Sequence, residues 1–144
     1  TDYAYVVKRI LNDLDWFDVQ TIGYDPWNAT QVANDLQEAG LDVDRLTIVR
    51  QGTKTLSPVL KEMQRLLLTG TKEAPLFRHH GNPVLRWNVD NLAVKTDTNG
   101  NVQPDKQNSG DKIDGVAAVL NALSEALSRP APKRSIYEEE SLFA

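Results

Sequence analysis

Apolar residues recur along the chain either every three or four positions or in short β-branched runs. The first spacing is typical of amphipathic helices and the second of short strands. In residues 2–17, for example, Val6, Ile10 and Leu14 share one helical face and Lys8 lies on the other. The same reasoning predicts helices over residues 2–17, 29–39, 57–70 and 111–128 and strands over 19–24, 46–49, 83–88 and 92–95.

Capping and breaking residues set the expected ends of these elements. Asp2 and Asn28 are the predicted N-caps of the first two helices, and Gly40 is the predicted glycine after the second. Ser57-Pro58 predicts a helix start, because proline is preferred at the first helical position. Residues 97–101, which include Asn-Gly, predict a tight turn after the last strand.

The order of these elements is helix, strand, helix, strand, helix, hairpin, helix. This alternation predicts an α/β layer fold with helices packed on a sheet. One domain is expected over residues 1–129. The residues after Pro130 are first rich in proline and then acidic at Glu138–Glu140, which predicts a flexible C-terminal tail over 130–144.

Composition narrows the chemistry. The chain has no cysteine, which excludes disulfides, thiolate zinc sites and cysteine nucleophiles and fits a reducing cytoplasm. A net charge of −4 counts against tight autonomous DNA binding but is compatible with an acidic cation site. No stretch approaches the ~20 consecutive apolar residues that span a bilayer, so no membrane partner is expected.

Three aspartates are candidates for that cation site. Asp25 ends an apolar strand, at the sheet edge where α/β proteins bind ligands, although it would also suit a simple turn before the next proline. Asp111 and Asp114 are three apart and would share the first turn of the last helix, where the helix dipole favours acids in any case. The helix dipole alone is enough to explain Asp111. Asp114 lies beside the buried stripe, and the small Gly115 leaves room for a ligand role.

Carboxylates that converge from a strand end and a helix would form an oxygen site for Mg²⁺ or Mn²⁺. Two such ions ~4 Å apart activate water and stabilise the leaving oxygen of a phosphodiester. Only the fold can bring Asp25 and Asp114 together. Spacing alone therefore leaves the site a hypothesis.

Other candidates carry weaker signals. His79 and His80 would point to opposite sides of an extended chain, so at most one would serve a site. The favoured alternative packs one beneath the hairpin and exposes the other. Basic residues between 50 and 112 would form a local rim around an acidic centre. Trp27 and Trp87 are expected to pack at a strand end and in the core, not to stack on bases.

Several short motifs follow one another in a fixed order over about residues 2–128. They are Tyr24-Asp25-Pro26-Trp27, Gln51-Gly52 with Leu56-Ser57-Pro58, His80-Gly81-Asn82-Pro83-Val84-Leu85 with Trp87 and Asn91, Asp97 with Asn99-Gly100-Asn101, Lys106, and Lys112-Ile113-Asp114-Gly115-Val116-Ala117-Ala118. No single motif is strong, but the whole series resembles the phage terminase large subunit family.

That resemblance implies a ribonuclease H-like nuclease, with a mixed sheet flanked by helices, that cuts concatemeric double-stranded DNA during genome packaging. It implies Asp25 and Asp114 as catalytic metal ligands for Mg²⁺ or Mn²⁺, with two metals in the complete domain. It also implies that basic residues and a histidine at matching positions contact DNA. These are Lys106, His80 and Lys112. The implied partners of the full-length protein are the small terminase subunit and the portal, in the host cytoplasm.

The resemblance also implies an upstream strand that carries another essential aspartate, and none precedes Tyr3. The chain is therefore expected to be N-terminally truncated and to lack one metal ligand, which leaves open that it is inactive. Asp111, Asp97 or Asp105 would have to replace the missing ligand, and Asp111 is taken as the further metal ligand. No GxxxxGK[ST] phosphate loop occurs, so the packaging ATPase is not expected here.

Two alternatives to the packaging nuclease stay open. An incomplete ribonuclease H-like fragment would act only as a docking module for the portal or another terminase subunit. Another nuclease of the same fold, such as a junction resolvase, would use a similar acidic site.

Overall fold

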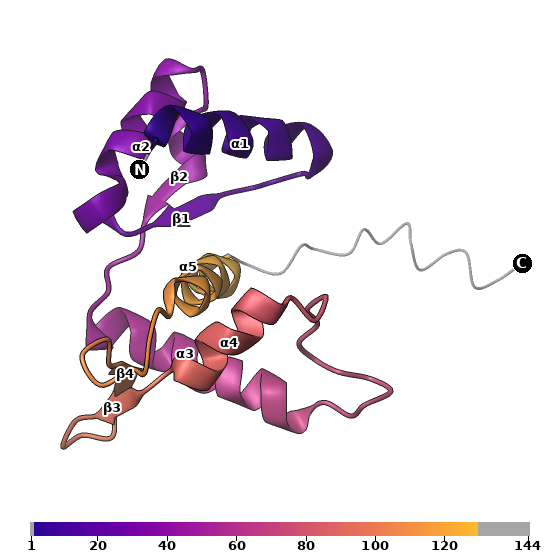
Figure 1. Cartoon of the computed structure of the whole chain (residues 1–144), viewed down its shortest axis with the longest axis vertical. Helices are drawn as coiled ribbons and strands as arrows, with labels where there is room; N and C mark the ends of the chain where they lie inside the picture. The colour runs from indigo at the N-terminus through magenta and orange to yellow at the C-terminus, as the bar shows by residue number, and fades with distance from the viewer. Residues whose placement is uncertain (1, 130–144) are drawn as a thin grey trace, which may run out of the picture.

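The structure is a computed structural model that describes residues 2–129 (Figure 1). The predicted tail over 130–144 lies outside the described residues. The elements are α1 (Tyr3–Trp16), β1 (Ile22–Tyr24), α2 (Pro26–Glu38), the 3-10 helix η1 (Val43–Arg45), β2 (Leu46–Ile48), α3 (Thr53–Thr69), α4 (Pro83–Asn91), β3 (Val94–Thr96), β4 (Val102–Pro104) and α5 (Asp114–Ser128). None of these helices is long and apolar enough to cross a membrane.

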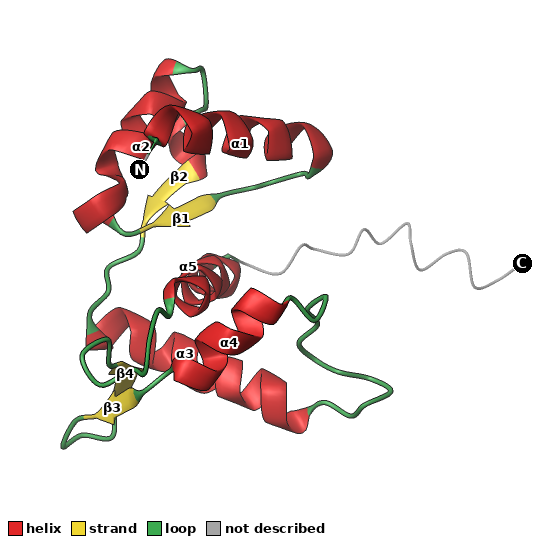
Figure 2. Cartoon of the chain, in the orientation of Figure 1, coloured by secondary structure: helices red, strands yellow, loops and turns green. Residues whose placement is uncertain are grey.

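The elements form two halves that meet at α5 (Figures 1 and 2). In the upper half β1 and β2 pair in parallel, with Ile22 opposite Leu46 and Tyr24 opposite Ile48. Helices α1 and α2 lie on one side of this small sheet and α5 on the other. In the lower half α3, α4 and the antiparallel β3–β4 hairpin lie below α5.

The main core lies between α3 and α5. Its buried side chains come from both helices and from the end of β2. They are Val49, Leu56, Val59, Leu60, Met63, Val116 and Leu120. Val116 and Leu120 are 0% and 1% exposed, which makes α5 the element that both halves pack against. Burial of a large aliphatic side chain stabilises the fold by roughly 1.5–3 kcal/mol, so this cluster is the main source of stability.

The α/β class is correct, but the expected single mixed sheet is not present among residues 2–129. The strands there form two separate two-stranded sheets. The segment 83–88, predicted as a strand, is helix α4. Asn82 caps it by accepting hydrogen bonds from the backbone N–H groups of Val84 and Leu85, and Pro83 occupies the first turn. The partner of β3 is therefore β4, which follows the predicted turn at 97–101.

Several predicted boundaries also moved. Helix α3 begins at Thr53, so Pro58 lies inside the helix instead of opening it. The predicted N-cap Asn28 is wrong, because Asp25 caps α2 and Pro26 starts it. The cap at Asp2 and the glycine after α2 are confirmed. Gly40 has φ +96°, and its N–H donates to the carbonyl of Gln37, which closes the helix end.

Candidate active site

Asp25 lies at the carboxyl edge of the parallel sheet. The N–H of Val49 donates to the carbonyl of Tyr24 over 2.8 Å, so the chain leaves β1 and β2 side by side. One Asp25 oxygen, Oδ1, accepts a hydrogen bond from the N–H of Trp27 over 3.1 Å. No residue whose side chain the structure describes donates a hydrogen bond to the other oxygen, Oδ2. The sheet therefore presents one carboxylate oxygen at the place where α/β proteins bind ligands.

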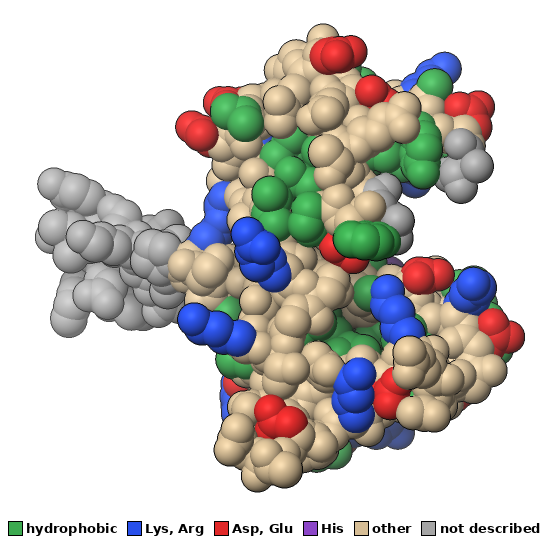
Figure 3. Space-filling view, turned by 90° about the vertical axis from the view of Figure 1, so that its left-hand side faces the viewer, with side chains coloured by type: hydrophobic (Ala, Val, Ile, Leu, Met, Phe, Trp, Pro, Cys, Tyr) green, Lys and Arg blue, Asp and Glu red, His purple; other side chains and the backbone are tan. Residues whose placement is uncertain are grey.

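A hollow of about 320 Å³ opens beside Asp25, between the sheet edge, the β3–β4 hairpin and the start of α5. Asp25 and Asp105 are its acidic lining residues, and Lys95 and Lys106 are its basic ones. A second hollow, which Asp25 and Gln51 also line, includes Arg50. Figure 3 views the molecule from this side and shows Lys and Arg side chains around its narrow middle. Three of the basic residues between 50 and 112 therefore lie around Asp25, as the predicted basic rim requires. They are Arg50, Lys95 and Lys106.

Asp105 organises the loop that carries Lys106. Its Oδ2 accepts a hydrogen bond from Nδ2 of Asn108 over 2.7 Å, and its Oδ1 accepts from the backbone N–H of Gln107 over 3.2 Å. The Asn108 side chain is the main reason that the pKa of Asp105 lies below its ordinary value, and Lys95 adds a smaller effect in the same direction. Because both oxygens are already engaged, Asp105 is a loop anchor more than a free ligand.

Asp111 and Asp114 do not share a helical turn, because α5 begins at Asp114. Asp111 lies in the preceding loop, where its side chain accepts a hydrogen bond from the N–H of Lys112 over 2.7 Å. Asp114, Asp111 and Lys112 are all exposed. The predicted common face of the two aspartates is therefore wrong.

The start of α5 is capped from another helix. Ile113, at the N-cap position, makes no side-chain cap, and Oδ1 of the buried Asn88 in α4 accepts the N–H of Gly115 instead. A β-carbon at position 115 would lie 2.7 Å from that oxygen, so only glycine admits the cap. From the sequence, Gly115 was expected to leave room beside Asp114. Its role in the cap was not predicted, because the capping residue Asn88 is 27 positions away.

Asp114 lies on the face of α5 that is turned toward the Asp25 edge. Residues 114, 117 and 121 share one helical face. Ala117 lines the same hollow as Asp25, and Oδ1 of Asn121 accepts a hydrogen bond from Nε2 of Gln51, another lining residue, over 3.0 Å. Asp114 itself does not line that hollow. The structure thus places Asp25 and Lys106 in the hollow, with Asp114 one turn along the adjoining helix.

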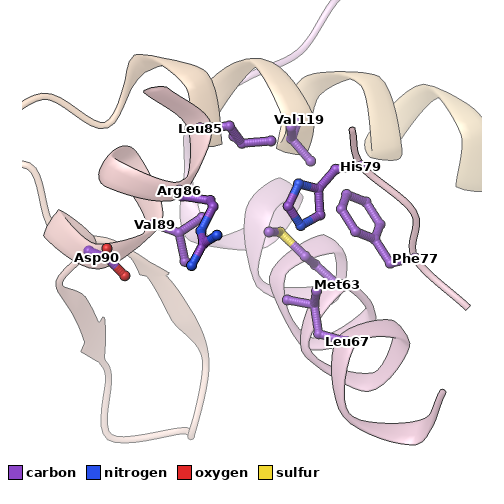
Figure 4. A pocket seen from close by; sticks show the side chains of 9 residues that line it. All are labelled: Met63, Leu67, Phe77, His79, Leu85, Arg86, Val89, Asp90 and Val119. Carbon is purple, nitrogen blue, oxygen red and sulfur yellow. The ribbon is translucent and has the colours of Figure 1, made fainter. Parts of the chain in front are cut away.

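The histidine pair lies elsewhere. His80 is exposed in the loop between α3 and α4 and lines neither hollow at Asp25. His79 lines an apolar pocket between α3, α4 and α5, with Met63 and Val119 (Figure 4). Its Nδ1 accepts a hydrogen bond from the N–H of Gly81 over 3.2 Å. The expectation that one histidine packs beneath a hairpin fails, because the segment after it is helix α4.

Two further observations bear on the site. Trp27 is 87% exposed and Trp87 is 43% exposed, so neither is packed as predicted. Within residues 2–129, no three His, Cys, Asp or Glu side chains gather closely enough to form a metal cage. Any ion at this edge would therefore depend on fewer protein ligands.

Comparison with known proteins identifies the family. Residues 1–129 match the family described as "Terminase large subunit, endonuclease domain". The chain belongs to this family. The predicted resemblance to the terminase large subunit family is confirmed.

The relatives that match are much longer than this chain. It is 30% identical over 125 residues to the "Terminase, large subunit" of Enterobacteria phage HK97, covering 87% of this chain and 24% of that protein. It is 28% identical over 145 residues to "Protein YmfN" of Escherichia coli (strain K12), covering 99% of this chain and 28% of that protein. The chain therefore spans about a quarter of the length of these relatives.

The fold is also shared with a solved terminase. The crystal structure of the HK97 bacteriophage large terminase matches with a TM-score of 0.76 and 29% identity, over 87% of this chain and 25% of that one. The mixed α/β arrangement of helices and small sheets is thus that of a region of a large terminase. The predicted site residues stay predictions.

Proposed function

We propose that this chain is a metal-dependent DNA endonuclease that cuts concatemeric double-stranded DNA during genome packaging. Membership of the terminase endonuclease-domain family supports the reaction class. The site is supported by one observation above the others. Asp25 follows β1, and one of its carboxylate oxygens accepts no hydrogen bond from the residues whose side chains the structure describes. The Gln51–Asn121 bond joins this edge to the helix that carries Asp114.

The donors at this edge suit Mg²⁺ or Mn²⁺. Hard cations prefer oxygen ligands, and Mg²⁺ commonly binds through one or two carboxylates while it keeps several waters and contacts substrate phosphates. Asp25 and Asp114 are the proposed ligands, and the Asp114 carboxylate accepts no hydrogen bond within the described part of the chain. A second ion needs more oxygen donors, for which Asp111 in the neighbouring loop is the proposed source. When bound, such ions would offset the charge that develops on the phosphodiester.

The side chains around the site would hold the DNA. Lys106 and Lys95 face the hollow, and Arg50 lines the adjoining one, so phosphates on either side of the cut would meet positive charge. Lys112 next to α5 and His80 in the α3–α4 loop are proposed as outer contacts. Contacts of this kind position the duplex without reading base edges, which suits sequence-independent cutting. In the full-length protein, the small terminase subunit and the portal are the expected partners, in the host cytoplasm.

The direct test is Mn²⁺-dependent nicking of supercoiled plasmid by this chain. Asp25→Asn keeps a good N-cap and removes the charge, and Asp114→Asn removes the second proposed ligand. Each is expected to lower the nicking rate by about 100-fold or more, in the range known for misplaced catalytic groups. Asp42→Asn is the matched control, because Asp42 caps η1 through its Oδ1 in the same way and is not part of the site.

The outcomes separate the candidate functions. Nicking that survives both Asp25→Asn and Asp114→Asn would refute the site. A parent chain that shows no Mn²⁺-dependent nicking would favour the docking module, which the lack of a three-ligand cluster within residues 2–129 also favours. Preference for a four-way junction over linear duplex would instead indicate a resolvase.

A further inference from the structure

Gln51 joins the edge of the parallel sheet to α5. Its Nε2 donates to the carbonyl oxygen of Val49 and to Oδ1 of Asn121, each over 3.0 Å, which uses both hydrogens of the amide. Within residues 2–129 this is the one side chain–side chain hydrogen bond between that edge and α5. Gln51 is also half-buried and lines both hollows that contain Asp25.

The backbone of Asn121 is held at the same point. A β-carbon at position 23 would lie 3.0 Å from the carbonyl oxygen of Asn121 and 2.9 Å from Cγ2 of Val49. Gly23 therefore lets β1 approach α5 closely at this residue. Contact with the strand limits the distance between β1 and α5. Core packing and the Asn88 cap at Gly115 set the rotation of α5 about its own axis, and the Gln51 bond limits the rotation that remains.

That rotation decides where Asp114 points. Asn121 is two helical turns after Asp114, on the same face and about 10 Å along the axis. A carboxylate about 6 Å from the axis moves by about 2 Å when the helix turns by ~20°, and a misplacement of about 1 Å can cost ~100-fold in rate. Asp114 makes no hydrogen bond of its own within the described residues, so its position follows from that of α5.

We propose that Gln51 and Asn121 are positioning residues, which hold the Asp114 face of α5 at a fixed rotation against the strand end that carries Asp25. The proposal rests on the proposed function, since it assigns these two side chains to the same cation site. A purely structural contact would stabilise the fold equally well but would leave cation affinity unchanged in the folded protein.

Substitutions at the two ends of the bond distinguish these roles. Gln51→Leu removes both donors at similar volume, Asn121→Leu removes the acceptor, and Asn121→Asp keeps an acceptor oxygen. The readouts are the Mn²⁺ dissociation constant from isothermal titration calorimetry and the plasmid nicking rate at saturating Mn²⁺. Both Leu variants are expected to weaken Mn²⁺ binding about 10-fold and to slow nicking by about 10- to 100-fold.

Two further variants test the cause. Asn121→Asp is expected to stay within about threefold of the parent in both readouts, since it keeps the bond. The double variant Gln51→Leu/Asn121→Leu is expected to be no worse than either single one, because both remove the same interaction. Ser57→Ala is the stability control. It removes another part-buried hydrogen bond, from the N–H of Val102 to Oγ of Ser57, and neither of these residues lines the hollow.

The positioning role would be overturned if the Leu variants bound Mn²⁺ and nicked DNA as well as Ser57→Ala does. It would also be overturned if Asn121→Asp were as impaired as Asn121→Leu. Failure of the proposed function looks different. In that case Asp25→Asn itself would bind Mn²⁺ and nick DNA like the parent. An inactive Asp25→Asn beside a fully active Gln51→Leu would reject only the positioning role.

Discussion

Asp25 has one role in the fold and one in the proposed function. Its Oδ1 caps α2 through the N–H of Trp27, and the proposal assigns its other oxygen, Oδ2, to a cation. The sequence suggested a turn residue at Asp25 and placed the N-cap at Asn28, so the cap formed by Asp25 was not predicted. The distance between the Asp25 and Asp114 carboxylates could not be predicted from the sequence. The two residues are far apart along the chain, and only packing places the helix that carries Asp114.

Asp25→Ala and Asp25→Asn should therefore separate stability from activity. We expect Asp25→Ala to lower the free energy of unfolding by about 1 kcal/mol, the usual cost of a lost N-cap, and Asp25→Asn to change it little. Both should lose Mn²⁺-dependent nicking. Urea unfolding followed by circular dichroism measures the first effect. An alanine variant as stable as the parent would show that this cap contributes nothing.

Acid should destabilise the protein through two other aspartates. Hydrogen bonds from the Asn101 side chain hold the pKa of Asp97 below its ordinary value, and those from Asn108 do the same for Asp105. A pKa lowered by folding adds stability that is complete above the unfolded value of about 3.9 and is lost as the pH falls through the folded value.

We therefore expect the thermal unfolding midpoint to fall as the pH drops below about 4. Asp105→Asn and Asp97→Asn should each make that fall shallower, because the variant side chain does not titrate. Calorimetry from pH 7 to pH 2 follows the midpoint. Parent and variants with parallel pH profiles would contradict this account.

At the scale of elements, the start of α5 depends on α4. The sequence predicted α5 three residues too early, since Asp111 looked like a first-turn acid, and predicted 83–88 as a strand. In the segment 83–88, residues that favour a strand compete with residues that favour a helix start. Val84 and Trp87 favour strands, whereas Asn82-Pro83 is a helix start, and the helix prevails because Asn88 then reaches the N–H of Gly115.

Gly115→Ala is expected to destabilise the protein by about 1–3 kcal/mol, because the new methyl group would displace the Asn88 oxygen from a partly buried N–H. In an Asn88→Ala background the same change should be neutral or stabilising, since alanine is the better helix former by up to about 1 kcal/mol. Urea unfolding of the four proteins completes the cycle. A cost of Gly115→Ala that is independent of residue 88 would rule out the clash.

At the scale of the molecule, stability is unevenly distributed. Helix α1 has no buried residue and packs mainly against α2, whereas α3 and α5 supply most of the core. The apolar spacing of residues 2–17 predicted α1 and its cap correctly, because those signals are local. The pairing of β3 with β4 is local, across the predicted turn at 97–101, but β4 itself was not predicted. The division into two small sheets depends on how distant segments pack and was not predictable from spacing.

We expect native-state hydrogen exchange to show this difference. Amides of α1 should exchange through local opening at a free energy well below that of global unfolding, while those of α5 around Leu120 should exchange only on global unfolding. Mass spectrometry or NMR of the 144-residue chain resolves the two helices. Equal protection of α1 and α5 would mean that the two halves unfold as one unit.

The exposure of Trp27 has a practical consequence. Its indole ring is 87% exposed and stands two positions after Asp25, on the rim of the second hollow. A chain in which Trp16 and Trp87 are replaced by phenylalanine would carry a single tryptophan, at the sheet edge, which can be excited selectively over the tyrosines. Its emission would then respond to a paramagnetic ion or to a nucleic acid arriving there, and so would report occupancy in solution without an added label.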